Sequence, residues 1–525
     1  MITFTPKKNI VLFSLEAKSR HLFETFGGPY PSPNLSRLVA QGVDFTQMHS
    51  AAGSTAMSLA SVVHGRYTHD LGRVDYDSST VYGDNIFSEM TRRGRRSYFV
   101  WHDSQEFLIK YIPKIYKGPD VEVRGASIDD PYFSTAVARK VIEIANESDQ
   151  PFFIMAHTSP ERPCDPSLKS EWRNEHERFI FEDDLAIGIL LDNLDLQDTR
   201  IILYSDHGVH TGQHGGMFEY AFSLYQPILN VPCVVSDDRP GRATDPYSLI
   251  NLYDIALDRS VAPPAHIISD TMYPSQVHRV TAVRRGDWKY MAHYNWGTAI
   301  TGLQEELYDL RVDPGENRNL LNDVARCPLR VEWNAANLQQ PKHRKFGYND
   351  DLIRTNVREL RSIISDIWVS GFLPLLSSLD PAIKADLEQK LEFAHPVEKM
   401  SIIGTLVEML CEKPPCYENV RPGTVFPGLP VAHPGLPRIP KNVHFSTYDA
   451  PPVDSLFMRR SHTRAVPAQT AQPIHRRVEV SSEAAPRLEI KSEVVSAEAK
   501  PSGTPDSLVT GREAIDEKLG LRFKR

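Results

Sequence analysis

A short apolar run that leads straight into a histidine-rich polar loop is the feature that most restricts how this chain can fold. Residues 201–204 are all apolar, and Ser205, Asp206, His207 and Gly208 follow them directly. Such a run is typical of a strand buried on both faces of an α/β sheet, and ligand sites gather where these strands end. Asp206 and His207 offer an oxygen and an imidazole nitrogen, which suit zinc, manganese or iron, although both residue types are also common in turns.

A second stretch of the same kind lies near the start of the chain. Residues 10–15 are predicted to form another buried strand, and Glu16 follows it at the place that Asp206 has on its own strand. If the two strands are neighbours, Glu16, Asp206 and His207 meet at one edge of the sheet and form a metal site. Taken by itself, Glu16 is interpreted more simply as a solvated loop carboxylate.

Five motifs, in order along the chain, carry a resemblance to a known family. They span residues 33–38, 42–46, 65–67, 205–208 and 305–320. Together they resemble the sulfatase-like branch of the alkaline phosphatase superfamily, over roughly residues 8–325. The resemblance implies an α/β fold of the alkaline phosphatase type, with a mixed, mostly parallel sheet, helices on both faces and a small antiparallel subdomain.

One departure from that family decides which nucleophile is expected. In formylglycine sulfatases the nucleophile derives from a cysteine ten residues before the glycine of the Gly-Arg motif, but here that position is Thr55. The accompanying proline and arginine are replaced by Met57 and Leu59. Thr55 resembles instead the threonine nucleophile of phosphoglycerol transferases, nucleotide pyrophosphatase-like phosphodiesterases and phosphonoacetate hydrolases. We therefore expect Thr55 to be catalytic, with capping of a helix over residues 56–63 as its alternative role.

The metal is expected to differ from that of the calcium-binding sulfatases. Their Asp-Asp pair is replaced by Glu16 and Ala17, and their Asp-Asn pair by Asp206 and His207. An imidazole in place of an amide oxygen favours manganese or zinc as the divalent metal ion, with calcium or magnesium as the alternatives.

Two histidines are predicted to bind the substrate. His157 ends the predicted strand 151–156, and His214 lies in a Gly-Gln-His-Gly sequence that resembles the Gly-Glu-His-Gly of the family. Glu161 stands where relatives often have a histidine, and Glu219 stands near the place of their lysine. The anionic group must then be bound by other side chains, and a structural role is the alternative for His157.

These residues predict a metal-dependent hydrolase or transferase that acts on a small-molecule phosphate or phosphonate ester through a covalent Thr55 intermediate. One alternative is a sulfuric ester hydrolase that works without formylglycine. Another is a catalytically weakened homologue that acts as a binding or assembly protein, suggested by the missing arginine and lysine and by the long C-terminal tail. Residue types do not reveal the organic group of the substrate, hydrolysis versus transfer, or the oligomeric state.

Hydrophobic periodicity predicts alternating helices and strands between the motifs. Helices are expected at residues 56–63, 85–93, 132–146 and 175–194, and strands at 97–101, 151–156 and 231–235. Strands are also expected within 280–310. Residues 248–257 resemble the helix that precedes the small subdomain in the family, and residues 288–290 resemble the edge strand of the family's small sheet. The predicted division is 1–260 for the catalytic domain, 261–349 for the small subdomain, 350–413 for a helical extension and 414–525 for a Pro-rich, largely disordered tail.

The composition excludes several other classes of protein. With 525 residues, 41% of them hydrophobic, the chain can bury a large core, and its formal net charge of -8 argues against a nucleic-acid partner. No apolar run is long enough to span a bilayer, and no basic and apolar segment precedes the first strand, so we expect a cytoplasmic protein. Five scattered cysteines fit free thiols better than a disulfide framework.

Overall fold

The computed structural model describes most of the first 372 residues of the chain. These are residues 1–71, 85–102, 120–126, 132–158, 175–211, 213–216, 218–220, 223–271, 278–295, 302–321 and 347–372, with the isolated positions 385, 388–389, 391–392 and 399. The tail 414–525, most of the extension beyond Phe372, Glu161 and four of the five cysteines lie outside the described residues, and the described cysteine, Cys233, is a buried free thiol.

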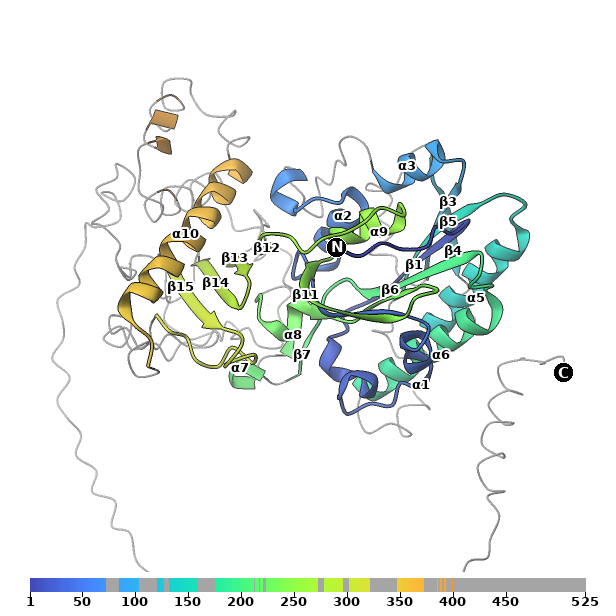
Figure 1. Cartoon of the computed structure of the whole chain (residues 1–525), viewed down its shortest axis with the longest axis horizontal. Coiled ribbons are helices and arrows are strands. Elements are labelled where there is room, and N and C mark those ends of the chain that lie inside the picture. Colours follow the sequence, from blue (N-terminus) through green and yellow to red (C-terminus); the bar gives the residue numbers. More distant parts are fainter. Residues whose placement is uncertain are drawn as a thin grey trace, which may run out of the picture. The chain divides into compact units, whose positions relative to one another are not determined.

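A mixed, mostly parallel sheet organises the larger part of the described chain (Figure 1). Its strand order is β11-β2-β10-β6-β1-β5-β3-β4, and β9 pairs with β2. The neighbours of β1, namely β5 and β6, run parallel to it, whereas β10 runs antiparallel to both β6 and β2. The strands are β1 Asn9–Leu15, β2 Gly42–His49, β3 Arg96–His102, β4 Glu122–Ala126, β5 Phe152–His157, β6 Thr199–Ser205, β9 Asn230–Val231, β10 Cys233–Ser236 and β11 Gly241–Ser248.

Helices cover both faces of this sheet, as the resemblance implied (Figure 1). One face is covered by α2 Thr55–His64, α3 Ile86–Arg92 and α9 Asn251–Ala256, and the other by α1 Pro33–Val39, α5 Phe133–Glu147 and α6 Glu175–Asn193. Alternate residues of β1 enter two separate cores: Ile10 and Leu12 pack on the α2 side, and Val11, Phe13 and Leu15 on the α6 side. This explains why residues 10–13 and Leu15 of the strand are all apolar.

Local sequence signals set several of the helix ends. Asn85 caps α3 in a capping box with Ser88, so the helix begins one residue after the predicted start. Gly65 ends α2 with φ 61°, and a Cβ there would lie 2.8 Å from the ring of Tyr253. The glycine of the Gly-Arg-Tyr motif is therefore required both by the left-handed backbone and by the close packing of α9.

A smaller antiparallel sheet follows, with the order β12-β13-β14-β15. Its strands are β12 Ile267–Asp270, β13 His278–Arg285, β14 Trp288–Asn295 and β15 Gly302–Asp309. The prediction that residues 288–290 lie on the edge was wrong, because β14 pairs with β13 on one side and β15 on the other. Three residues of sequence do not reveal how many neighbours a strand has, and Tyr290 is fully buried in this internal strand.

A long helix, α10 Asp350–Phe372, packs on the small sheet. Short elements complete the described chain: η1 Arg20–Leu22, η2 Glu24–Phe26, η3 Thr68–Leu71, β7 His210–Thr211, α7 Gln213–Gly216, β8 Phe218–Glu219 and α8 Gln226–Leu229. Among the described helices, none has the length and apolar character needed to cross a bilayer.

A buried ion pair ties the loop after β1 to strand β2. Arg20 donates from Nη1 and Nη2 to the two carboxylate oxygens of Asp44, each at 2.8 Å, and its guanidinium lies 3.5 Å from the centre of the Phe26 ring. Both side chains are buried, so the charges are removed from water and each depends on the other. The pair holds the chain that leaves β1 in a fixed position beside the sheet.

Arg20→Met should lower the free energy of unfolding by about 3–5 kcal/mol, because it leaves the carboxylate of Asp44 buried without its bidentate partner. Arg37→Met is the matched control, since Arg37 and Asp192 form an exposed Arg–Asp pair whose loss should cost about 1 kcal/mol or less. Urea unfolding followed by circular dichroism measures both changes. Equal, small effects would contradict a structural role for the Arg20–Asp44 pair.

Candidate active site

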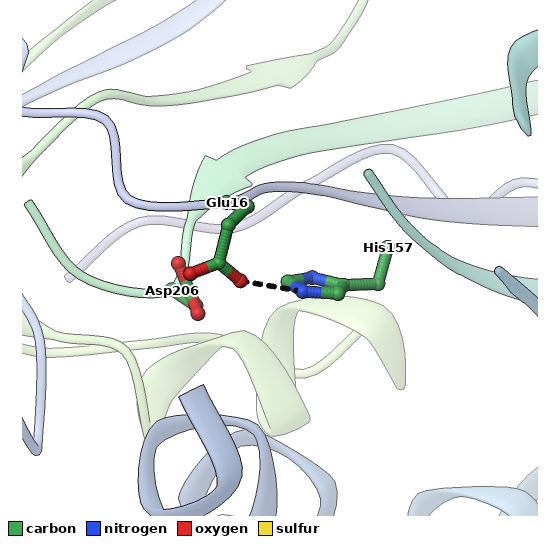
Figure 2. Close-up of side chains that lie close together, drawn as sticks. All are labelled: Glu16, His157 and Asp206. Atoms are coloured by element: carbon green, nitrogen blue, oxygen red, sulfur yellow. Dashed lines mark hydrogen bonds and ion pairs between the residues drawn. The ribbon is translucent and has the colours of Figure 1, made fainter. Parts of the chain in front are cut away.

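The carboxyl ends of three neighbouring parallel strands bring acidic and imidazole side chains together. Glu16 follows β1, His157 is the last residue of β5, and Asp206 follows β6, as Figure 2 shows. One ligand atom from each lies within 4.8 Å of the others, and all three side chains are buried. The strand register produces this meeting, because Ser14 pairs with His157 and Leu15 with Ser205.

The carboxylate of Asp206 has one satisfied oxygen and one without a donor. Its Oδ1 accepts from the backbone N–H groups of Ala17 at 3.0 Å and His207 at 2.8 Å. Its Oδ2 is buried without a hydrogen-bond partner and lies 3.4 Å from Nε2 of His207. A buried carboxylate oxygen with no donor is costly, and a cation at this point would offset the cost.

His207 presents a lone pair to the same space. Its Nδ1 lies 2.9 Å from the backbone oxygen of Gly208, and a carbonyl only accepts, so in the neutral ring Nδ1 carries the hydrogen. Nε2 is then free of hydrogen and lies 3.6 Å from Oε1 of Glu16. Acceptor atoms from Glu16, Asp206 and His207 thus face one another, which is the arrangement expected of metal ligands whose orientation is fixed by their surroundings.

His157 also joins this group, a position that the sequence analysis did not predict. Its Nε2 lies 2.8 Å from Oε2 of Glu16, and its Nδ1 lies 3.1 Å from the hydroxyl oxygen of Ser14. The ring is fully buried, and it is a member of the group of three that can hold a metal ion. The strand end of β5 was the signal available in the sequence, but it did not distinguish a ligand from a substrate contact.

Thr55 points its hydroxyl into the same group from the first position of α2. Its Oγ1 lies 3.1 Å from both carboxylate oxygens of Glu16 and 3.1 Å from Nε2 of His207. The N-cap position of α2 belongs to Ser54. Glu16, Thr55, Asp206 and His207 therefore lie within contact distance, although they come from three separate parts of the sequence.

His214 lies in a second, neighbouring group. Its ring stacks on Tyr225 at a centroid distance of 4.0 Å and lies 5.5 Å from the ring of His210. Burial, followed by the proximity of His214, lowers the pKa of His210 to about 3, so that ring is neutral near pH 7. His214 is not a member of the group formed by Glu16, His157 and Asp206, and its predicted contact with substrate stays a prediction.

Buried charges support the loop that carries Glu16. Lys18 donates from Nζ to the backbone oxygen of Glu16 at 2.5 Å and lies 3.8 Å from Oδ2 of Asp183. Burial raises the pKa of Asp183 to about 6 and that of Glu182 to about 8. The sequence analysis did not predict a role for these residues. Lys18 lies in the expected loop after the first strand, and the two acidic residues lie on an amphipathic helix, where charges are ordinarily solvated.

Comparison with known proteins is consistent with this geometry. Residues 8–258 match the family model described as Sulfatase. This match covers just under half of the chain and shows that these residues are similar to the sulfatase family. It also supports a hydrolase that acts on sulfate or phosphate esters. No protein of curated function matches the chain in sequence.

Several solved structures share the fold at low sequence identity. A protein from Bacteroides thetaiotaomicron VPI-5482, provisionally assigned as a sulfatase, aligns with a TM-score of 0.51 and 13% identity over 72% of this chain and 96% of its own. An alkaline phosphatase superfamily protein from Vibrio parahaemolyticus aligns at 0.47 and 16% over 60% and 83%. The phosphonate monoester hydrolase of Agrobacterium radiobacter aligns at 0.44 and 16% over 59% and 91%. The first of these supports the fold assignment.

Asp206→Asn should change stability in opposite directions with and without metal. In the presence of a chelator it should raise the melting temperature by about 2 °C or more, because an amide nitrogen beside Nε2 of His207 replaces an unpaired buried charge. It should also abolish the rise in melting temperature that added manganese or zinc gives the wild type. Differential scanning calorimetry with and without metal measures both effects.

The control is Asp44→Asn, which alters a buried aspartate with both oxygens paired to Arg20 and should lower the melting temperature in both conditions. If Asp206→Asn destabilised the metal-free protein and kept the metal-dependent rise, Asp206 would not be a ligand.

Proposed function

We propose that this chain is a metal-dependent hydrolase or transferase of phosphate or phosphonate esters that uses Thr55 as its nucleophile. The observation that carries the proposal is the position of Thr55 Oγ1, 3.1 Å from both oxygens of Glu16 and from Nε2 of His207. One hydroxyl has a single proton, yet three acceptor atoms surround it. The hydroxyl therefore has a carboxylate and an imidazole nitrogen in position to take its proton, which is what a nucleophilic threonine requires.

Glu16, Asp206 and His207 are the residues proposed to hold the divalent cation, with His157 as a further candidate. The unpartnered Oδ2 of Asp206 and the lone pair on Nε2 of His207 support this assignment. When bound, a divalent cation lowers the pKa of a nearby hydroxyl and offsets negative charge on the oxygens of the ester. Two carboxylates and an imidazole favour manganese or zinc over calcium.

The residues of the chain suffice for a balanced two-step reaction. In the first step Thr55 Oγ1 attacks phosphorus, its proton passes to the carboxylate of Glu16, and the bond between phosphorus and the ester oxygen breaks. The departing alcohol takes that proton from Glu16, and the phosphoryl or phosphonyl group stays on Thr55. In the second step a water molecule, or an acceptor alcohol in a transferase, gives a proton to Glu16 and attacks the same phosphorus. The bond between phosphorus and Oγ1 breaks, and Oγ1 takes the proton from Glu16, which returns Thr55 to its hydroxyl form.

Sulfate-ester hydrolysis is the second candidate, and the match of residues 8–258 to the Sulfatase family model favours it. Thr55 argues for the phosphorus substrates, because this position carries a cysteine-derived formylglycine in the sulfatases that the chain resembles. The remaining features of the site, a buried nucleophile beside two carboxylates and two imidazoles, suit either tetrahedral ester.

A substrate panel separates the candidates. Purified protein loaded with manganese, zinc or calcium would be assayed with p-nitrophenyl phosphate, bis-p-nitrophenyl phosphate, p-nitrophenyl phenylphosphonate and p-nitrophenyl sulfate. Faster turnover of a phosphorus ester supports the proposal, whereas turnover of the sulfate alone supports the second candidate. Bound metal with no turnover of any ester favours a protein that binds without catalysis.

Thr55→Ala should lower kcat by at least about 1,000-fold and leave metal content unchanged, because it removes the nucleophile but no carboxylate or imidazole ligand. Ser54→Ala, which alters the preceding hydroxyl, is the matched control and should retain kcat within a few-fold of wild type. Steady-state kinetics and elemental analysis give the two readouts. Wild-type turnover by Thr55→Ala would exclude a covalent role for this residue and would point to Ser54 or an activated water.

A further inference from the structure

The loop formed by residues 50–55, here the nucleophile loop, joins β2 to the first residue of α2 and is buried along its whole length. Nucleophilic catalysis requires the attacking atom to stay within a few tenths of an ångström of its productive position. What holds this loop in place therefore bears on the proposed function, and the contacts come from three separate parts of the chain.

Two serines attach the nucleophile loop and α2 to the backbone of Asp206. Ser58, one turn after Thr55 on α2, donates to the backbone oxygen of Asp206 at 2.6 Å, and Ser50 donates to the same oxygen at 2.5 Å. Both hydroxyls are completely buried. The distance between the helix that carries Thr55 and the strand end that carries Asp206 is thus set by hydrogen bonds to one carbonyl group.

The small sheet holds the opposite side of the loop. Ser269 donates from its hydroxyl to the backbone oxygen of Ser50 at 2.6 Å, and the N–H of Asp270 donates to the backbone oxygen of Ala51 at 3.0 Å. Ala52 and Asp270 form an isolated parallel bridge. Strand β12 is therefore hydrogen-bonded to the main chain of the nucleophile loop, so any movement of β12 also moves the loop.

Helix α10 fixes β12 through a short series of buried hydrogen bonds. Trp368 donates from Nε1 to the hydroxyl oxygen of Thr281 at 2.7 Å, and that hydroxyl donates to Oδ1 of Asp270 at 3.1 Å. Trp368, Thr281 and Asp270 are all fully buried. Since Trp368 donates and Asp270 accepts, the single hydroxyl of Thr281 is used as acceptor and donor at once, which fixes its direction.

Apolar packing and an ion pair hold α10 in the same position. Ala51 of the nucleophile loop belongs to one buried cluster with Leu360, Ile364 and Trp368 of α10. Arg361 of α10 donates to both carboxylate oxygens of Glu305 on β15, at 2.6 and 3.0 Å, and both side chains are buried. The helix is therefore part of the support of the loop, in addition to covering the small sheet.

We propose that α10 is a positioning element of the active site, which holds the nucleophile loop through Trp368, Thr281 and Asp270. The helix begins at Asp350, well beyond residue 258, where the match to the family model ends. The placement of Thr55 then depends on a helix that is remote from it in the sequence. This inference rests on the proposed function for its effect on turnover, but its effect on loop dynamics is independent of any activity.

The decisive variants are Thr281→Val, which removes both hydrogen bonds at nearly constant volume, and Thr281→Ser, which retains the hydroxyl. Hydrogen–deuterium exchange of the full-length protein should show amides of residues 50–58 exchanging about tenfold faster or more in Thr281→Val, with wild-type exchange in Thr281→Ser. Peptides from β1 serve as the internal reference and should exchange as in wild type. Trp368→Phe should give the same faster exchange at residues 50–58 as Thr281→Val. Trp288→Phe, which changes a tryptophan of the small sheet that packs against Tyr348, should leave this exchange unchanged.

Turnover gives the second readout. On the ester that the wild type cleaves best, Thr281→Val and Trp368→Phe should lower kcat about tenfold with KM and metal content unchanged, because substrate and cation contacts stay intact while the nucleophile loses its support. Wild-type exchange at residues 50–58 in both variants would overturn the inference, and so would faster exchange spread equally over β1. Absence of turnover in the wild type would instead refute the proposed function, and the exchange data would still decide the role of α10.

Discussion

The enforced proximity of two buried carboxylates is the physical constraint around which the site is built. Glu16 and Asp206 directly follow the adjacent parallel strands β1 and β6, whose register places the two residues side by side. Both side chains are buried. Like charges in such a place repel one another at short range unless a cation lies between them. The hydrogen-free Nε2 of His207 and the ring of His157 complete a set of groups that favours a divalent cation.

The fold supplies this constraint by placing its most apolar strands at the centre. β1, β5 and β6 are covered by helices on both faces, so the positions of their ends are determined by tightly packed side chains. Loops that follow such strands start from a rigid base, and Thr55 approaches the same point from α2. Rigidity of the frame and reactivity of the site are therefore connected through the ends of the strands.

The support of the site extends beyond the segment that resembles sulfatases. The nucleophile loop is bonded on one side to the loop of Asp206 and on the other to β12, and β12 in turn is fixed from α10. A shared fold does not by itself fix the chemistry, since the same sheet can present different nucleophiles. In this chain Thr55 stands where the formylglycine sulfatases that the sequence resembles have a cysteine-derived residue.

The sequence by itself determined the central strands β1, β5 and β6, several of the helices, and three of the groups that meet at the strand ends. Runs such as residues 10–13 and 201–204 are apolar because both faces of each strand are buried, and the polar residues that follow these strands were predicted to form one group, namely Glu16, Asp206 and His207. Local patterns suffice for such conclusions, because periodicity and turn chemistry act over a few residues. The motif order also supported the fold class, a mixed sheet with helices on both faces.

Only the tertiary structure decided which distant groups share a contact. It placed His157 against Glu16, put β14 inside the small sheet rather than on its edge, and linked Trp368 to the nucleophile loop through Thr281 and Asp270. Strand order, register and helix docking arise from packing between segments far apart in sequence, and no short pattern of residues encodes that geometry.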